Sequence, residues 1–107
     1  VIIISLVCLF LSCQESTIDL DCSLSLTKKG IRFENKDDFA YENVEITIND
    51  KYLHKKDVFY PSLPIIIPLR EFSDDDGNRF ANKVVKKVSV FCNLTEQGKN
   101  GYFYGEL

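Results

Sequence analysis

The chain has 107 residues, of which 45% are hydrophobic and 27% are charged, and its formal net charge is −3. This composition is typical of one small globular domain; it excludes a disordered chain and leaves no room for a second domain. Lysines and arginines form no cluster longer than the pairs Lys28–Lys29, Lys55–Lys56 and Lys86–Lys87. An acidic chain with so few clustered cations is repelled by phosphate backbones, so nucleic acid is excluded as a partner. We expect the lysine pairs at solvated strand ends and turns.

Residues 1–12 form an apolar segment without any charged residue, and the first charge after it is Glu15. The segment is shorter than the about 20 residues that a helix needs to cross a bilayer. It is followed by a polar run, residues 14–17. This pattern predicts the apolar part of a secretory signal peptide. Because the basic N-terminal region and an initiating Met are missing, we expect the signal peptide to be truncated at its start.

The apolar segment ends in Leu9-Phe10-Leu11-Ser12-Cys13, with a small residue directly before a cysteine. These residues resemble the lipobox of bacterial lipoproteins in its relaxed, Bacteroidetes-type form, with Phe10 where the commonest pattern has leucine. The resemblance implies cleavage before Cys13 and attachment of diacylglycerol to its thiol. It also implies a place in the bacterial cell envelope, with the lipid anchored on the periplasmic side or at the outer membrane surface.

The sequence therefore predicts three parts: a signal peptide over residues 1–12, a lipid-anchored tether over residues 13–17, and a single β domain over residues 18–107. In the first part of that domain, apolar and polar residues alternate from Ile18 to Leu26, which predicts one half-buried strand. The same alternation predicts a strand over residues 43–49, with Val44, Ile46 and Ile48 facing inward. A short strand over residues 31–33 follows the turn at residues 28–30.

Three further strands are predicted in the second half of the chain. Leu63, Ile65, Ile67 and Leu69 share one face, but Pro64 and Pro68 limit this strand to an edge or a bulge. A later strand carries Val88, Val90 and Cys92 on its inward face. The chain closes with an aromatic strand, residues 102–104, after a turn over residues 98–101.

No segment shows a helical period with caps, and the one weak candidate for a helical turn lies within residues 78–87. About seven short strands separated by turns predict an all-β, antiparallel sandwich of immunoglobulin-like type, with a small closed barrel as the alternative. Residues 33–35, 43–49, 71–72 and 76–80 are similar to small β domains of bacterial lipoproteins. This resemblance covers strand and turn signals and implies no activity.

Cys22 and Cys92 remain as thiols if Cys13 carries lipid. Both fall at inward positions of predicted strands, and an envelope protein matures in an oxidising compartment. A bridge between them would stabilise the domain by roughly 4 kcal/mol in the chain-entropy model. Two buried free thiols are the equal alternative. A zinc site is disfavoured, because neither cysteine has a nearby Cys or His partner in the sequence.

The sequence contains no motif of a catalytic nucleophile, a phosphate-binding loop or a metalloprotease, so we expect no enzyme and no cofactor. The single histidine, His54, lies in a basic segment that we expect to be a solvated loop. Asp74, Asp75 and Asp76 precede Gly77 and are a weak candidate for a calcium site. The acidic ligand of an EF-hand loop is missing at residue 83, which is lysine, so a tight turn is favoured and no metal is expected.

Several aromatic residues fall outside the predicted inward pattern: Phe39, Tyr41, Phe91 and two of the rings in residues 102–104. They indicate either a binding face or the covering of loops and edges. Our leading hypothesis is a non-catalytic binding or structural domain on a lipid anchor, with an envelope protein or a glycan as partner. The alternative is a small inhibitor of a periplasmic or cell-wall hydrolase, which would use the longest loop, Arg70–Asn82.

Overall fold

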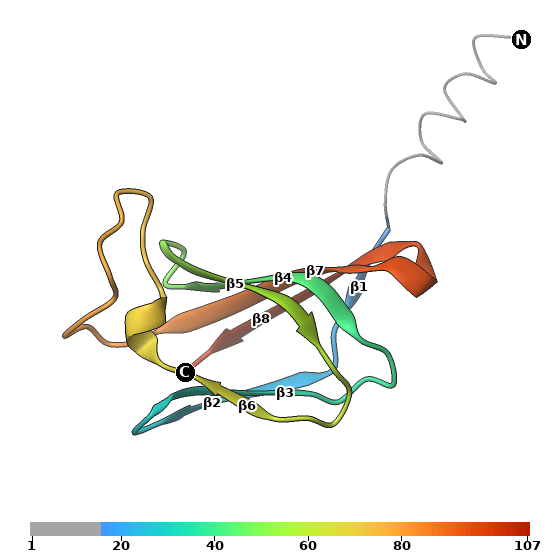
Figure 1. Ribbon diagram of the computed structural model, residues 1–107, viewed down its shortest axis with the longest axis horizontal. Helices are drawn as coiled ribbons and strands as arrows, with labels where there is room; N and C mark the ends of the chain where they lie inside the picture. The colour runs from blue at the N-terminus through green and yellow to red at the C-terminus, as the bar shows by residue number, and fades with distance from the viewer. Residues whose placement is uncertain (1–15) are drawn as a thin grey trace, which may run out of the picture.

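The computed structural model describes residues 16–107, which form eight strands in two sheets (Figure 1). The strands are β1 (Thr17–Asp19), β2 (Cys22–Thr27), β3 (Gly30–Asn35), β4 (Tyr41–Ile48), β5 (Tyr52–Phe59), β6 (Ile65–Ile67), β7 (Lys87–Leu94) and β8 (Lys99–Glu106). Two short 3-10 helices, η1 (Leu69–Glu71) and η2 (Thr95–Gln97), lie in connections. No α-helix occurs in the described part of the chain, as the sequence predicted.

The two sheets face each other and enclose one hydrophobic core. The larger sheet has the order β1-β8-β7-β4-β5, and the smaller sheet has the order β2-β3-β6. All pairs are antiparallel except β1–β8, which is parallel. The expectation of an all-β fold is confirmed, whereas the closed barrel considered as an alternative is wrong, because the two sheets keep separate edges.

The first predicted strand is in fact two strands that belong to different sheets. β1 pairs with β8 in the larger sheet, and β2 pairs with β3 in the smaller one. Between them the backbone N–H of Leu20 donates to the carbonyl of Tyr102, and the carbonyl of Asp21 accepts from Lys36. The period of two continues across this crossing, because both sheets line the same core and Leu20 and Cys22 are each buried. The alternation therefore predicted the burial of Leu20 and Cys22 correctly, but it was wrong for Leu26, which is 50% exposed, and it predicted one strand instead of two.

A bulge in β4 reverses the expected position of Tyr41. The register between β4 and β7 shifts between Glu42 and Glu45, and Asn43 has a φ of 49°. The additional residue allows both Tyr41 and Val44 to face the core, although strict alternation would place them on opposite faces. Tyr41 is fully buried. The prediction that it lies outside the inward pattern is therefore wrong.

The segment that contains His54 is not the loop that the sequence predicted but the edge strand β5. Its residues pair with β4 along their whole length, from Tyr41 opposite Phe59 to Ile48 opposite Tyr52. The lysines and the histidine gave this segment no strand pattern in the sequence. It forms a strand nevertheless, because an edge strand tolerates charged side chains where a central strand would not.

The remaining predicted strands are confirmed with adjusted bounds. The inward side chains of Val44, Ile46, Ile48, Val88 and Val90 are at most 1% exposed. β6 is three residues long, pairs with β3 alone and lies between Pro64 and Pro68, as expected for an edge. The final turn occupies η2 and Gly98, so β8 begins earlier than predicted. Residues 16–107 include no helix that is long and apolar enough to cross a membrane.

Candidate functional site

Three exposed aromatic rings lie together on the outer face of the larger sheet. Phe91 of β7 pairs directly with Tyr102 of β8, and Tyr104 lies one outward position further along β8. Phe91 and Tyr102 are each 40% exposed, and Tyr104 is 45% exposed. We call these three residues the aromatic strip. Directly paired residues of antiparallel strands have side chains about 5 Å apart, so neighbouring rings can contact one ligand together.

Polar side chains continue the rows of the aromatic strip across the sheet. Asp19 of β1 pairs with Tyr102, and Glu45 of β4 pairs with Phe91. Glu45 in turn lies opposite Lys55 of β5. Across these four strands, the two rings of Tyr102 and Phe91 therefore lie between the carboxylates of Asp19 and Glu45.

A second row consists of side-chain amides. The Nδ2 of Asn43 donates to the Oδ1 of Asn93 at 3.0 Å, and the Nδ2 of Asn93 donates to the Oδ1 of Asn100 at 2.9 Å. These bonds fix the amide planes beside the rings. An amide retains further donor and acceptor capacity after one bond of each kind.

Tyr104 adds a hydroxyl to this surface. Its hydroxyl donates to the Oε1 of Glu106 at 3.4 Å. Desolvation and the nearby negative charge of Glu106 raise the pKa of Tyr104. The phenol is therefore protonated at neutral pH and can serve as donor and acceptor.

The aromatic strip with its flanking polar residues can bind a partner by surface contact. Aromatic faces contribute apolar area with few rotatable bonds, and the neighbouring carboxylates and amides can orient polar groups of the partner. The sequence pattern predicted that Phe91 and two rings of the last strand lie outside the core and are candidates for a binding face. The structure shows which two, and it brings them beside Phe91. Phe39, also named, packs against the core instead.

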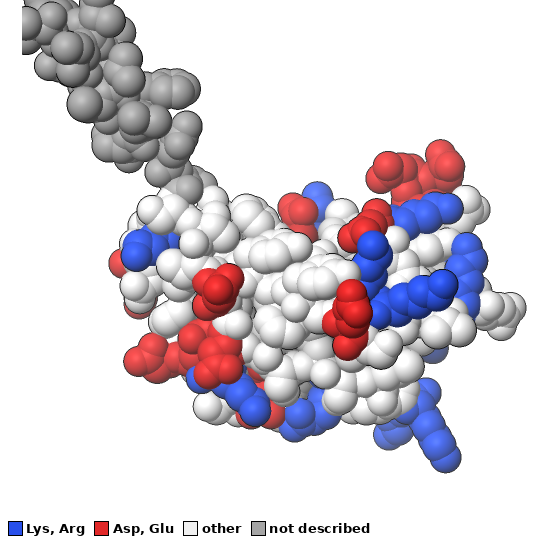
Figure 2. Space-filling view, turned by 180° about the vertical axis from the view of Figure 1, so that it is seen from behind, with Lys and Arg blue, Asp and Glu red and all other residues white. Residues whose placement is uncertain are grey.

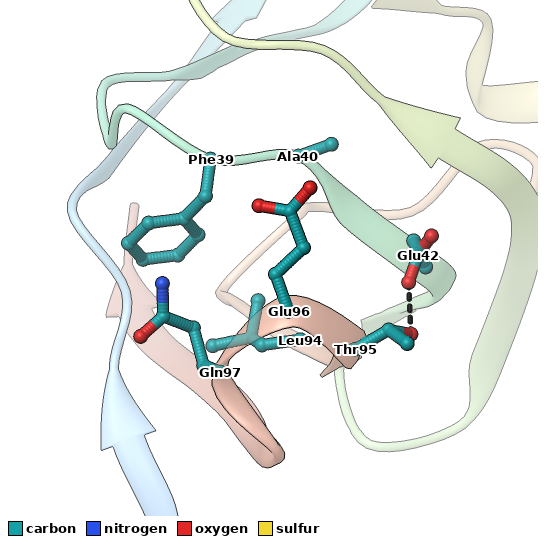
Figure 3. Close-up of a pocket in the computed structure, with 7 residues that line it drawn as sticks. All are labelled: Phe39, Ala40, Glu42, Leu94, Thr95, Glu96 and Gln97. Carbon is teal, nitrogen blue, oxygen red and sulfur yellow. Dashed lines mark hydrogen bonds between the residues drawn. The ribbon is translucent and has the colours of Figure 1, made fainter.

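A small hollow lies at the end of the sheet near η2, lined by residues of the β3–β4 connection and of η2 (Figure 3). Glu42 accepts a hydrogen bond from the hydroxyl of Thr95 at its rim. The volume of the hollow is about 40 Å³, which is close to that of one water molecule. This hollow is too small to be a ligand site.

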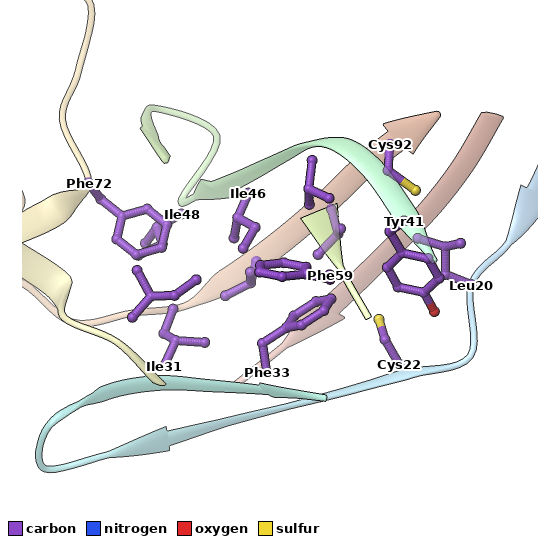
Figure 4. Close-up of a cluster of buried hydrophobic side chains, with 14 of the residues drawn as sticks. Leu20, Cys22, Ile31, Phe33, Tyr41, Ile46, Ile48, Phe59, Phe72 and Cys92 are labelled. Carbon is purple, nitrogen blue, oxygen red and sulfur yellow. The ribbon is translucent and has the colours of Figure 1, made fainter. Parts of the chain in front are cut away.

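Cys22 and Cys92 lie on opposite sheets at one end of the core, and each has a free thiol in the structure (Figure 4). In the view of Figure 4, the ring of Tyr41 lies between them. Burial, followed by the negative charge of Asp37, raises the pKa of Cys22 to about 12. Burial also raises the pKa of Cys92 to about 12. Neutral thiols of this kind are weak nucleophiles and behave as small apolar side chains. The disulfide stays a prediction.

The three consecutive aspartates form the tip of a loop. The Oδ1 of Asp74 accepts hydrogen bonds from the backbone N–H groups of Asp76 and Asn78, and Gly77 has a φ of 83°. Partial desolvation raises the pKa of Asp74, but the hydrogen bonds from Asn78 outweigh it, so this pKa is lowered overall. In residues 16–107 no three His, Cys, Asp or Glu side chains gather to hold a metal ion. The geometry is that of an aspartate-stabilised turn.

His54 contacts the base of the same loop. Its ring lies 5.4 Å from the ring of Phe72, and its Nδ1 is 3.2 Å from the carbonyl oxygen of Glu71. These contacts give the histidine a packing role on the edge strand. No serine, cysteine or carboxylate hydrogen-bonds to its ring among the described residues.

The loop Arg70–Asn82 protrudes from the end of the molecule opposite the start of β1, as the yellow-to-orange segment in Figure 1. Its base is fixed, because Leu53 and Ser73 exchange two backbone hydrogen bonds and the backbone N–H of Phe80 donates to the carbonyl of Phe72. Phe72 and Phe80 are both buried. The exposed tip is thus held on two aromatic anchors.

Cys13 and the predicted signal peptide over residues 1–12 lie outside the described residues. The described chain reaches the sheet almost at once, because the carbonyl of Ser16 accepts from Asn100 and Thr17 already pairs in β1. A lipid on Cys13 would therefore be three residues from the fold.

No protein-family model, no curated protein and no solved structure matches this chain.

Proposed function

We propose that the protein is a non-catalytic binding module of the bacterial cell envelope, held at a membrane by lipid on Cys13. Its partner is an envelope protein or a glycan, which contacts the outer face of the larger sheet. The aromatic strip carries this proposal. Three large rings on one sheet face remain 40–45% exposed, and exposed apolar surface of this kind marks interaction sites.

We further infer that the domain is an immunoglobulin-like sandwich. Three features support this assignment: two sheets that face each other, a chain that crosses from one sheet to the other after β1, and an inward cysteine in each sheet. In such folds the sheet faces and the loops at both ends are available for recognition.

The lipid anchor is tested by replacing Cys13. We expect the protein extracted from membranes to have a mass that includes acyl chains, and Cys13→Ser to abolish both this mass increment and the partition into detergent. Cys8→Ser makes the same chemical change five residues earlier and should leave both unchanged. A Cys13→Ser variant that still carries acyl chains would contradict the proposal.

The binding face is tested with the double variant Tyr102→Ala/Tyr104→Ala. We expect it to weaken binding to the envelope partner at least about tenfold, because aromatic residues at the centre of an interface carry much of its free energy. Binding is measured as retention of envelope-extract proteins and as co-sedimentation with insoluble envelope glycan. The first readout reports a protein partner, and the second reports a glycan.

A matched control is available in the connection between β5 and β6. Tyr60 and Leu63 are 59% and 58% exposed, and Tyr60→Ala/Leu63→Ala removes similar apolar area away from the outer face. Binding that both double variants weaken equally, or that neither weakens, would exclude the aromatic strip as the binding site.

The second candidate function is inhibition of a periplasmic or cell-wall hydrolase. The fixed base and exposed tip of loop Arg70–Asn82 favour it, because a preorganised loop binds at a lower entropic cost. The same retention experiment separates the two functions. A hydrolase that is retained by Tyr102→Ala/Tyr104→Ala but lost with Asp75→Ala/Asp76→Ala at the loop tip would indicate inhibition.

A further inference from the structure

We propose that a basic hollow at the end of the molecule opposite the start of β1 binds the phosphate groups of an anionic ligand. The hollow lies between the β2–β3 turn, η1 and the segment that follows Phe80. Its cations are Lys28, Lys29, Arg70 and Lys83, and no carboxylate is among the residues that line it. We call it the basic hollow. It is separate from the aromatic strip and independent of the function proposed above.

The first wall of the basic hollow is a turn that its own hydrogen bonds hold in place. The Oγ1 of Thr27 accepts from the backbone N–H groups of Lys29 and Gly30, both at 3.2 Å, and donates to the carbonyl of Gly30 at 2.9 Å. Gly30 packs directly against the backbone of Ile67. The Cα atoms of both lysines therefore have a fixed position relative to η1, which begins two residues after Ile67.

The opposite wall is fixed by aromatic packing. Phe80 is buried and lies edge-to-face against Tyr52, with ring centroids 5.0 Å apart. The ammonium group of Lys83 donates to the hydroxyl of Tyr52 and lies 5.0 Å from the centroid of its ring. One of its three donors is thus used for positioning, and the others remain for a ligand.

The four cations of the basic hollow have no ion-pair partner among the described residues. The two ion pairs among residues 16–107 are Arg32–Glu34 and Lys87–Asp50, and neither includes a residue of the basic hollow. A chain with a net charge of −3 thus places four positive side chains around one concavity without a carboxylate. Such a focused positive potential attracts anions and is relieved when an anion binds.

The chemistry of the basic hollow fits phosphate groups. Lysine ammonium groups bind phosphate as point charges, and the Arg70 guanidinium can contact two phosphate oxygens at once. The volume is about 330 Å³, so the hollow admits a group larger than one phosphate. Figure 2 shows that, on the face seen from behind, most Lys and Arg side chains gather at the end away from the start of β1, with several Asp and Glu side chains beside them. This end would face outward from an anchor near β1.

The proposal is tested by titration of the ¹⁵N-labelled protein with inorganic pyrophosphate. We expect chemical-shift changes confined to residues 27–30, 68–70 and 80–83. We expect Lys28→Ala/Lys29→Ala to weaken binding about tenfold or more in calorimetry, because each lost charge-assisted contact weakens binding severalfold. Lys55→Ala/Lys56→Ala removes the same charge from β5 and should change the affinity less than twofold.

Thermal unfolding of both double variants shows whether each is folded. Arg70→Gln is a second test variant, because it removes a positive charge from another side of the basic hollow. A parallel arm uses vesicles that contain phosphatidylglycerol. Vesicle binding that is lost in Lys28→Ala/Lys29→Ala assigns lipid headgroups as the source of the phosphate, whereas pyrophosphate binding without vesicle binding assigns a soluble ligand. Absence of binding in both arms, or equal losses in the two lysine double variants, would overturn the proposal.

Discussion

We expect Gly30→Ala to destabilise the fold by about 3 kcal/mol or more, because two separate constraints act on this residue. Gly30 has a φ of 145°, a backbone conformation that residues with a Cβ rarely adopt. A Cβ at this position would lie 2.1 Å from the carbonyl oxygen of Ile67 and 2.8 Å from the Cα of Pro68. The clash involves backbone atoms, so a side-chain rotation cannot relieve it.

Gly98→Ala is the matched control for this prediction. Gly98 also has a positive φ, 63°, but an added Cβ would meet no atom within 4 Å. We expect a loss of about 1 kcal/mol there, which is the cost of the left-handed conformation alone. The free energies of unfolding are measured in urea. Equal losses in the two variants would mean that the contact between the β2–β3 turn and Ile67 is loose. Gly30→Ala should also weaken anion binding by the basic hollow.

We expect the reduced protein to lose stability steeply as the pH rises from about 9 to about 12. Burial raises the pKa of both Cys22 and Cys92 to about 12 in the folded chain, whereas an unfolded thiol titrates near pH 9. Above pH 9 the unfolded state therefore releases protons that the folded state retains, which favours unfolding. The contribution of each thiol to the free energy of unfolding is fully present below pH 9. By pH 10.5 we expect the free energy of unfolding to have fallen by on the order of 1 kcal/mol, once solvent screening is allowed for.

Urea unfolding at pH 8 and pH 10.5 measures this loss, and Cys22→Ala/Cys92→Ala is the comparison. The double variant should be less stable at pH 8, because it leaves cavities in the core, but its stability should fall less with pH. A residual slope remains, since the raised pKa of Tyr41 acts in the same direction. An equal slope in both proteins would contradict the prediction.

The redox state of the two cysteines is established first, by the intact mass. In the protein that carries lipid on Cys13 and lacks residues 1–12, Cys22 and Cys92 are the remaining thiols, so a loss of two hydrogens before reduction would demonstrate the bridge that the sequence predicts as one of two alternatives. The alkaline loss of stability would then appear only after reduction, because a disulfide has no proton to release.

Sequence patterns predicted the buried positions of the central strands, among them Val44, Ile46, Ile48, Val88, Val90 and Cys92. Alternation is sufficient for strands such as β7, where each inward residue packs on the same core. It failed at Tyr41, because a bulge adds one residue to β4 and no local signal marks the bulge. It also missed β5, since hydrogen bonding to β4 compensates for a poor strand sequence on the sheet edge.

Some features of the candidate sites could likewise be predicted from the sequence, whereas others depend on the tertiary structure. The sequence by itself determined the lipobox-like pattern at Cys13, the acidic loop tip, and the outward positions of Phe91 and of two last-strand rings, because these depend on neighbouring residues in the chain. Only the tertiary structure decided that Tyr102 and Tyr104 lie beside Phe91, which depends on the register of β7 against β8. Only it brought Lys28 and Lys29 to Arg70 and Lys83. The lysine pair, Arg70 and Lys83 are distant from one another in the sequence; the packing of Gly30 on Ile67 brings the lysine pair beside η1, and Tyr52 holds Lys83.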